Sequence, residues 1–280
     1  MYRIVTKTAL KPTVILYEIE APMVAKKAQP GQFIILRVDE NGERIPITIH
    51  DYDREKGTVT IIVQTVGATT EKLSHKEQGE CLHDFVGPLG KPTETEGKKK
   101  VCVVGGGVGC AIAYPVLKKF HDCGAEVHAV VGFKSKDVVI LEDKFKAVSS
   151  VLKVCTDDGS YGQKGLVTEA LKELLDAGNV YDEIFAIGPM VMMKFVCKTT
   201  APYGMPTTVS MSPIMIDGTG MCGGCRLTVG GETKFACVDG PDFDGDLVDF
   251  DEAMARGTMY RPFEAHAREA ACNLLNQEVK

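Results

Sequence analysis

The sequence lacks the segments that direct a protein into membranes or onto nucleic acids. No stretch reaches about 18 consecutive apolar residues, so a membrane span is not expected. Residues 1–7 lack the apolar run of a secretory signal peptide. With 32 Lys and Arg against 38 Asp and Glu, the net charge of −6 argues against binding to nucleic acid or to an anionic membrane surface. We therefore expect a cytoplasmic protein that binds neither.

The chain has 10 cysteines, but without a secretory signal they do not indicate a disulfide framework. In a reducing cytosol, clustered cysteines suggest a metal site and dispersed ones suggest small core residues. Most of the cysteines are dispersed, and the six histidines show no metal-ligand spacing. The clustered thiols are Cys222, Cys225 and Cys237.

The composition is that of an ordinary globular protein, and 280 residues suit two compact domains plus a smaller part. Residues 1–97 contain short alternating strands, such as 14–20 and 57–64, which predict a small antiparallel β-barrel. From residue 98 to 210, strands alternate with helices. This alternation predicts an α/β domain with a doubly wound parallel sheet.

The last part of the chain differs from both. Residues 211–250 are rich in cysteine and glycine. An acidic run over residues 239–251 is expected to be a solvated loop, and the alternative is that it faces a partner. Residues 251–280 are predicted to form a helical tail, with a helix over residues 264–276.

The strongest local pattern is the spacing Cys222-x2-Cys225-x11-Cys237 on a glycine-rich stretch. Two thiolates separated by two residues can face one metal centre, and the glycines let backbone N–H groups approach the sulfurs. The third thiolate follows a predicted hairpin. This spacing favours a compact iron–sulfur loop, and zinc is the competing metal.

Three cysteines leave a fourth ligand to be found. Asp217 lies five positions before Cys222, where related [2Fe–2S] loops have their first cysteine. A carboxylate at this position can complete a set of three thiolates and one carboxylate. The alternative is that Asp217 is a turn residue before Gly218.

A second pattern is a buried strand followed by Gly105, Gly106, Gly107 and Gly109 and then a helix. Such a turn brings backbone N–H groups and a helix N-terminus against a phosphate. The third glycine of a strict G-x-G-x-x-G comes one residue early. Tight packing between strand and helix is therefore the alternative explanation.

A third pattern combines Arg44-Ile-Pro46-Ile47-Thr48 with a later turn at Gly67, Thr69 and Thr70. Arg44 can pair with a pyrophosphate, Thr48 can hydrogen-bond a flavin ring, and the turn suits another phosphate contact. Without further context, a solvated arginine and an ordinary turn are the favoured explanation of these residues.

Taken in order along nearly the whole chain, these motifs resemble the ferredoxin–NADP reductase superfamily. Within it, the chain resembles the branch with a C-terminal [2Fe–2S] loop. That branch includes the electron-transfer subunits of dihydroorotate dehydrogenase and the small subunits of NADH-dependent ferredoxin:NADP oxidoreductase. The second of these is known for an aspartate where Asp217 stands, whereas the first generally has cysteine there. The superfamily's usual cysteine before Gly-Pro is Ile187 in this chain.

The resemblance implies three cofactors, FAD, NAD(H) and a [2Fe–2S] cluster, and assigns residues to each. FAD would contact the barrel at Arg44, Pro46, Ile47, Thr48, Gly67, Thr69 and Thr70. The nicotinamide nucleotide would contact Gly105, Gly106, Gly107, Gly109, Asp157, Asp158, Gly188 and Pro189. The cluster ligands would be Asp217, Cys222, Cys225 and Cys237. No catalytic residue is identified, and the sequence does not decide between NAD and NADP.

The function implied is that of an electron-transfer subunit in a bifurcating NADH-dependent ferredoxin:NADP oxidoreductase. Its partner would be a larger iron–sulfur flavoprotein subunit, in a heterodimer or a higher assembly, and ferredoxin would be reached indirectly. Two alternatives remain: service to a dihydroorotate dehydrogenase, and a non-enzymatic redox sensor whose cysteine loop holds a structural zinc.

Overall fold

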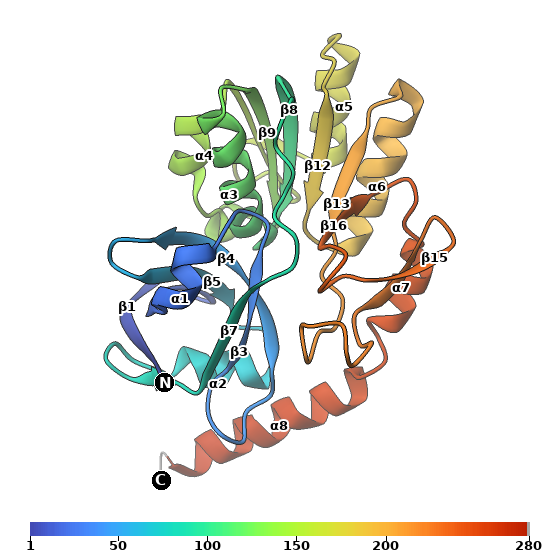
Figure 1. The fold of residues 1–280 in the computed structure, drawn as a ribbon. Helices are drawn as coiled ribbons and strands as arrows, with labels where there is room; N and C mark the ends of the chain where they lie inside the picture. The colour runs from blue at the N-terminus through green and yellow to red at the C-terminus, as the bar shows by residue number, and fades with distance from the viewer. Residues whose placement is uncertain (279–280) are drawn as a thin grey trace.

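A computed structural model describes the backbone of residues 1–278 and the side chains of residues 1–269. The chain forms two seven-stranded sheets and a separate two-stranded hairpin. Figure 1 shows the first sheet below the second, with the hairpin beside them and a long C-terminal helix running beneath.

The first sheet is an antiparallel barrel-like sheet with the strand order β6-β1-β2-β5-β4-β3-β7. Its strands bury one face, as the alternation of residues such as Tyr17, Ile19 and Ile61 predicts. The expected β-barrel is therefore confirmed. The strands are β1 (Tyr2–Lys11), β2 (Val14–Glu20), β3 (Phe33–Arg37), β4 (Ile45–Asp53), β5 (Thr58–Gln64), β6 (Cys81–Leu82) and β7 (Asp84–Leu89), and the helices are α1 (Pro22–Lys27) and α2 (Ala68–Ser74).

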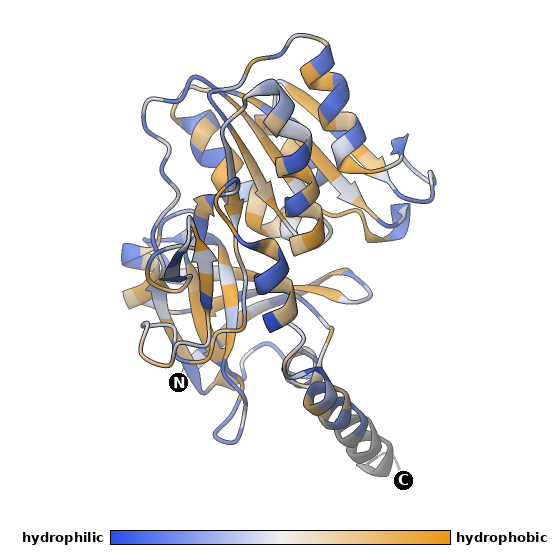
Figure 2. Ribbon diagram, turned by 90° about the vertical axis from the view of Figure 1, so that its right-hand side faces the viewer, coloured by the Kyte–Doolittle hydropathy of each residue, from blue (hydrophilic) through white to orange (hydrophobic). Residues whose placement is uncertain are grey.

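The second sheet has the order β11-β10-β9-β8-β12-β13-β16, and its strands are parallel except for β16. Helices α3 and α4 cover one face and α5 and α6 the other (Figure 1), which confirms the doubly wound α/β domain. Figure 2 shows the hydrophobic strands enclosed between helices with hydrophilic outer sides. The elements are β8 (Lys100–Gly106), α3 (Gly109–Asp122), β9 (Glu126–Phe133), η1 (Lys136–Val138), α4 (Glu142–Val148), β10 (Val151–Thr156), β11 (Gln163–Lys164), α5 (Val167–Asp176), β12 (Glu183–Ile187), α6 (Met190–Thr200), η2 (Ala201–Tyr203), β13 (Thr207–Ser210) and β16 (Asp242–Asp244).

The acidic run departs from its prediction. Within residues 239–251, which were expected to be a solvated loop, strand β16 pairs antiparallel with β13. The reason is local alternation, because Phe243 is buried between two aspartates and lies opposite Val209. The run therefore contributes the edge strand β16 to the second sheet and is not simply a solvated loop.

The remaining elements surround the cysteines. Strands β14 (Arg226–Val229) and β15 (Glu232–Phe235) form the hairpin, and α7 (Phe250–Arg256) packs on it. Helix α8 (Arg261–Glu278) follows. In the part of the chain that the structure describes, no helix is long and apolar enough to cross a membrane.

Candidate functional site

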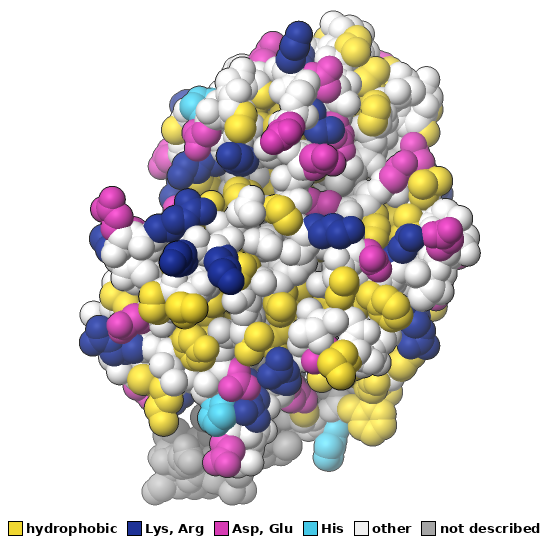
Figure 3. Space-filling view, in the orientation of Figure 1, with side chains coloured by type: hydrophobic (Ala, Val, Ile, Leu, Met, Phe, Trp, Pro, Cys, Tyr) yellow, Lys and Arg dark blue, Asp and Glu magenta, His cyan; other side chains and the backbone are white. Residues whose placement is uncertain are grey.

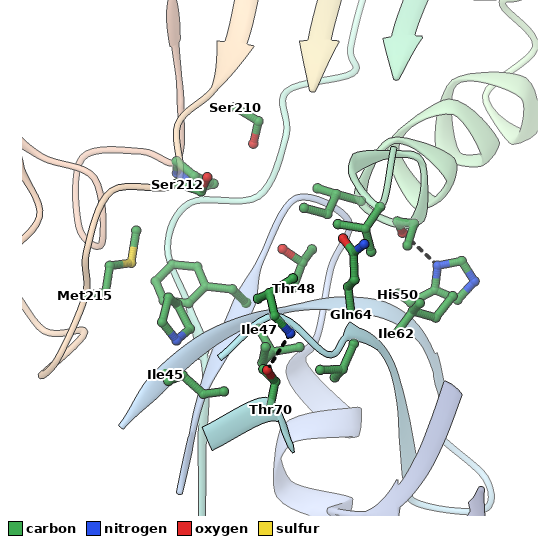
Figure 4. A pocket seen from close by; sticks show the side chains of 18 of the residues that line it. Ile45, Ile47, Thr48, His50, Ile62, Gln64, Thr70, Ser210, Ser212 and Met215 are labelled. Atoms are coloured by element: carbon green, nitrogen blue, oxygen red, sulfur yellow. Dashed lines mark hydrogen bonds between the residues drawn. The ribbon is translucent and has the colours of Figure 1, made fainter. Parts of the chain in front are cut away.

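A crevice of about 330 Å³ lies where the barrel meets the C-terminal edge of the parallel sheet. Its floor comes from β4 and β5, and its other walls come from the start of α3 and the segment after β13. Figure 4 shows Thr48 and Gln64 on the barrel side and Ser210 and Ser212 across from them. Mostly apolar walls with a few polar groups are typical of cofactor sites.

The structure brings part of the flavin motif to this crevice. Pro46, Ile47, Thr48 and Thr70 line it. These residues lie at the start of β4 and in α2, and β4 is held against β3 by pairing of Thr48 with Phe33. The arrangement can hold a flat aromatic ring between apolar walls, with the Thr48 hydroxyl as a polar contact.

Arg44 lies beside the crevice and contacts the segment that precedes the cysteines. Its Nε donates to the carbonyl of Ile216 (2.8 Å), and a terminal nitrogen donates to the carbonyl of Asp217 (3.4 Å). Another terminal nitrogen lies 3.4 Å from a carboxylate oxygen of Asp84. Arg44 thus joins the barrel to the cysteine-bearing segment.

The turn at Gly67 has a compact internal hydrogen-bond pattern. The Thr70 hydroxyl accepts from the amides of Val66 (2.9 Å) and Gly67 (3.0 Å) and donates to the Gly67 carbonyl (2.9 Å). The buried Thr69 donates to Glu43 (2.8 Å). Of these residues, Thr70 reaches the crevice, whereas Thr69 faces the neighbouring loop.

His50 is a crevice residue that the sequence analysis missed. It is 2% exposed, and its Nδ1 lies 2.7 Å from the carbonyl of Ala111 in the first turn of α3. Nδ1 therefore carries the proton, and Nε2 faces Lys144 Nζ at 3.4 Å. Burial lowers the pKa of His50 to about 4, so the ring is neutral. The period-two spacing from Thr48 is the sequence pattern that places His50 near the same site.

The glycine turn, residues 105–109, lies at the C-terminal ends of two adjacent parallel strands. A Cβ on Gly109 would lie 2.7 Å from the Ile187 carbonyl oxygen, and one on Gly188 would lie 3.1 Å from the amide of Gly106. The turn and the Gly188-Pro189 loop are therefore packed against each other. Strand β8 lies between β9 and β12, so the strand order proceeds in opposite directions on its two sides. Open α/β sheets bind nucleotides at such a point, at the C-terminal ends of the strands.

Asp157 and Asp158 lie at the same edge of the sheet, in the exposed turn after β10. The Asp158 carboxylate accepts from the amide (2.9 Å) and the hydroxyl (2.6 Å) of Ser160. The Ser160 hydroxyl contact lowers the pKa of Asp158. The predicted nucleotide residues thus share one edge, and the start of α3 connects this edge to the crevice.

The cysteine loop, residues 217–225, lies beside the β14–β15 hairpin. The sulfurs of Cys225 and Cys237 are 3.2 Å apart and both residues are buried. Burial raises the pKa of the Cys237 thiol, and the neighbouring Cys225 thiol adds to the rise. Metal binding displaces such protons, so a buried pair of thiols is a natural ligand pair.

Cys222, which is exposed, and Asp217, which is half-buried, form the more exposed half of the loop. The amide of Gly224 lies 3.5 Å from the Cys222 sulfur, and this contact, with a smaller one from the Asp217 amide, lowers the pKa of Cys222. The Asp217 carboxylate accepts from the Thr219 hydroxyl and amide, and these contacts lower its pKa. All of its hydrogen bonds fall on Oδ2. Asp217 thus holds the turn through Oδ2, and its carboxylate is ionised, which is the form that a metal ligand takes.

The thiols of Cys225 and Cys237 form one close pair, and Cys222 and Asp217 lie on the more exposed part of the loop. Among residues 1–269, no group of three or more His, Cys, Asp or Glu side chains is close enough to hold one metal ion. A tetrahedral zinc site needs four ligands around a single ion. A [2Fe–2S] cluster has two irons, each of which takes two protein ligands. The buried pair together with Cys222 and Asp217 supplies the four ligands that a two-iron cluster takes.

The crevice and the cysteine loop are joined by a very short stretch of chain. Met215 lines the crevice, and Asp217 begins the loop two residues later. Ser210, Ser212 and Met215 were not predicted, because the sequence marks this segment only by the end of the strand–helix pattern.

The comparisons with known proteins agree with this layout. Residues 212–249 match the family model of the iron–sulfur cluster binding domain of dihydroorotate dehydrogenase B. The chain is 53% identical over 276 residues to an uncharacterized protein of the adh 3′ region in Clostridium beijerinckii, covering 96% of this chain and 93% of that protein.

Two further relatives have more informative descriptions. A Thermotoga maritima homologue of the dihydroorotate dehydrogenase B (NAD⁺) electron-transfer subunit is 47% identical, covering 93% of this chain and 92% of the relative. A solved structure from a study of flavin-based electron bifurcation in the NADH-dependent reduced ferredoxin–NADP oxidoreductase is 45% identical. The match covers 96% of this chain and 97% of the chain in that structure, with a TM-score of 0.91.

These likenesses confirm the predicted family, its fold and the oxidoreductase class. The match over residues 212–249 bears out the expected iron–sulfur segment. The chain belongs to the family of dihydroorotate dehydrogenase B electron-transfer subunits and their homologues.

Proposed function

We propose that this chain is the electron-transfer subunit of a bifurcating NADH-dependent ferredoxin:NADP oxidoreductase. It would connect NAD(H), an FAD and a [2Fe–2S] cluster with a larger iron–sulfur flavoprotein subunit. The observation that carries the proposal is the adjacency of the crevice and the cysteine loop, which Met215 and Asp217 join within three residues. The likeness to the bifurcating oxidoreductase structure, at 45% identity over nearly the whole chain, supports this branch of the family.

The chemistry of the cofactors explains the order of the sites. A flavin accepts two electrons as a hydride and releases them singly, and an iron–sulfur cluster carries one at a time. In this proposal the residues of the chain supply position. Thr48 and the apolar walls of the crevice orient the flavin, and the glycine turn with Gly188 and Pro189 receives the nicotinamide nucleotide. Cys225 and Cys237 ligate one iron, and Asp217 and Cys222 the other.

The surface around the cysteine loop supports docking of a partner subunit. Ile216, Met221, Tyr260 and Phe263 are exposed large hydrophobic residues. A cavity of about 500 Å³ lined by Arg44, Ile216, Tyr260 and Phe263 lies beside them. Figure 3 shows hydrophobic side chains gathered on the lower part of the molecule. Exposed apolar side chains that lie close together are typical of protein–protein interfaces.

The test is anaerobic purification of the chain with its partner, followed by flavin and iron analysis, absorption and EPR spectroscopy. We expect FAD and two irons per chain, with a rhombic EPR signal in the reduced state. The variant Asp217→Cys should keep the signal and change its position, because one ligand changes from oxygen to sulfur. A protein that contains zinc and no flavin contradicts the proposal.

A second candidate is service to a dihydroorotate dehydrogenase, which the description of the Thermotoga relative favours. The identity of the co-purifying partner separates the two functions. A large subunit with its own iron–sulfur clusters supports the oxidoreductase, whereas an FMN-containing barrel supports the dehydrogenase. The aspartate at position 217 favours the first.

A further inference from the structure

Helix α7 ends in an arginine that reaches back to the cysteine loop. The Nε of Arg256 donates to the carbonyl of Arg226 (3.2 Å), and a terminal nitrogen donates to the carbonyl of Gly224 (3.3 Å). These two carbonyls flank Cys225, the buried member of the Cys-x2-Cys pair. One guanidinium thus fixes the backbone on both sides of a ligand residue.

The helix that carries this arginine is firmly attached to the hairpin. The Asp249 carboxylate caps α7 by accepting from the amide of Glu252 (2.9 Å), and the Asp249 amide donates to the carbonyl of Thr228 (2.9 Å). Phe250 and Ala253 are buried against the same unit. Because α7 is held at its N-terminal end and on one face, the position of Arg256 is set by packing.

The same guanidinium lies beside the exposed half of the loop. A cavity of about 170 Å³ is lined by Cys222, Gly224, Arg226 and Arg256. Two positive side chains therefore border the space next to the Cys222 sulfur. A cluster held by three thiolates and one carboxylate gains a further negative charge on reduction, and nearby positive charge favours that state.

We propose that Arg256 is a positioning residue of the cysteine loop. Its planar fork holds the Cys222–Cys225 turn in the ligand geometry, and its charge favours the reduced state of the bound cluster. The inference rests on the proposed iron–sulfur function. It adds a residue outside the 212–249 family match and outside the ligand set.

The test compares three variants of the purified, cluster-loaded complex. Arg256→Gln removes fork and charge, and Arg256→Lys keeps the charge without the fork. Arg261→Gln removes the same charge from an exposed position at the start of α8 and serves as the matched control. The readouts are the rate of iron release to a chelator, the midpoint potential from an EPR titration, and the EPR line positions.

We expect Arg256→Gln to release iron about tenfold faster, as residues that orient metal ligands commonly do when replaced, and to have a more negative midpoint potential. Arg256→Lys should release iron faster but keep a potential near that of the wild type. Arg261→Gln should match the wild type in all three readouts. If Arg256→Gln does not fold, the split between release rate and potential in Arg256→Lys carries the test.

The outcomes separate this inference from the proposed function. If both Arg256 variants release iron at the wild-type rate and keep the wild-type potential, the role of Arg256 is overturned and the proposed function stands. A change of the same size in Arg261→Gln also overturns it, because the effect would then be general electrostatics. A wild-type complex that binds no iron overturns the function, and the role of Arg256 with it.

Discussion

The two glycine-rich loops look alike in the sequence but differ in the share of their glycines that take a left-handed backbone. In the glycine turn, Gly107 alone has a positive φ, whereas Gly109 is required by close packing, because a Cβ there would lie 2.7 Å from the Ile187 carbonyl oxygen. In the cysteine loop, Gly220 and Gly223 have φ values of +86° and +65°, which side chains rarely adopt. A Cβ at Gly223 would have its nearest neighbour 3.7 Å away, so space is not limiting there.

The contacts that hold the two loops in place also differ. The glycine turn is fixed by the strands and helices on which it lies, and His50 of the barrel contacts the carbonyl of Ala111 just after it. The cysteine loop is fixed by two arginines that donate to its backbone carbonyls. Arg44 of the barrel binds the carbonyl of Asp217, and Arg256 of α7 binds that of Gly224. We therefore expect the glycine turn to keep its shape without a ligand. We expect the cysteine loop to depend more on the metal centre that it binds.

The largest expected effect comes from removing a ligand of the cysteine loop. Cys225→Ser should abolish assembly of the cluster, because it breaks the buried pair with Cys237. Flavin content should persist, since the crevice has separate walls. Iron analysis and the absorption spectrum measure both quantities. Cys123→Ser, at an exposed cysteine after α3, is the control and should keep its iron. Full iron content in Cys225→Ser would falsify the ligand assignment.

The second prediction sharpens the role of the polar contact at the glycine turn. Folding lowers the pKa of His50 from 6.5 to about 4. Between these two pH values the unfolded chain binds a proton at His50 and the folded chain does not. The stability that neutral His50 contributes is complete above about pH 6.5 and is lost as the pH falls toward 4. The shift corresponds to about 3 kcal/mol.

The matched variant for this prediction is His50→Asn, which can still donate to the Ala111 carbonyl but does not titrate. Urea unfolding at several pH values should give a steeper loss of stability for the wild type than for the variant between pH 6.5 and 4. Other groups near His50 are Asp51, Tyr114, Lys118 and Lys144, and they are common to both proteins. Parallel pH profiles would show that His50 is not the group responsible.

The smallest effect compares glycines of the two loops directly. Gly109→Ala should destabilise the protein by about 1–3 kcal/mol through overpacking against the Ile187 carbonyl. Gly223→Ala should cost about 1 kcal/mol through its left-handed backbone alone. Denaturant midpoints measure both. Equal costs would mean that packing does not distinguish the loops.

Local patterns allowed the strands and the main cofactor motifs to be predicted. The alternation over residues 14–20 corresponds to β2, and the run before the glycine turn corresponds to β8. The alternation of strands and helices does not locate the start of α4, which begins at Glu142 because Leu141 takes a left-handed conformation there. Such a backbone choice depends on tertiary contacts, which an apolar pattern does not contain.

The site contacts that were missed join distant parts of the chain. His50 acquires its role from Ala111, 61 residues later, and Arg44 binds the carbonyl of Ile216, 172 residues later. Neither contact follows a spacing rule, because each depends on how the barrel packs on the rest of the molecule. Asp217 and the three cysteines could be proposed because their spacing is local.

Strand β16 has a consequence for the architecture as a whole. It follows the cysteines in the chain and yet pairs with β13, so the cysteine segment returns to complete the sheet of the preceding domain. Near it, Thr93 of the barrel's exit segment donates to Asp242 (2.6 Å). A chain truncated after Ser210 would leave β13 as an uncovered edge strand, open to aggregation. The iron–sulfur segment is thus also a structural cover, and it cannot be deleted as an independent module.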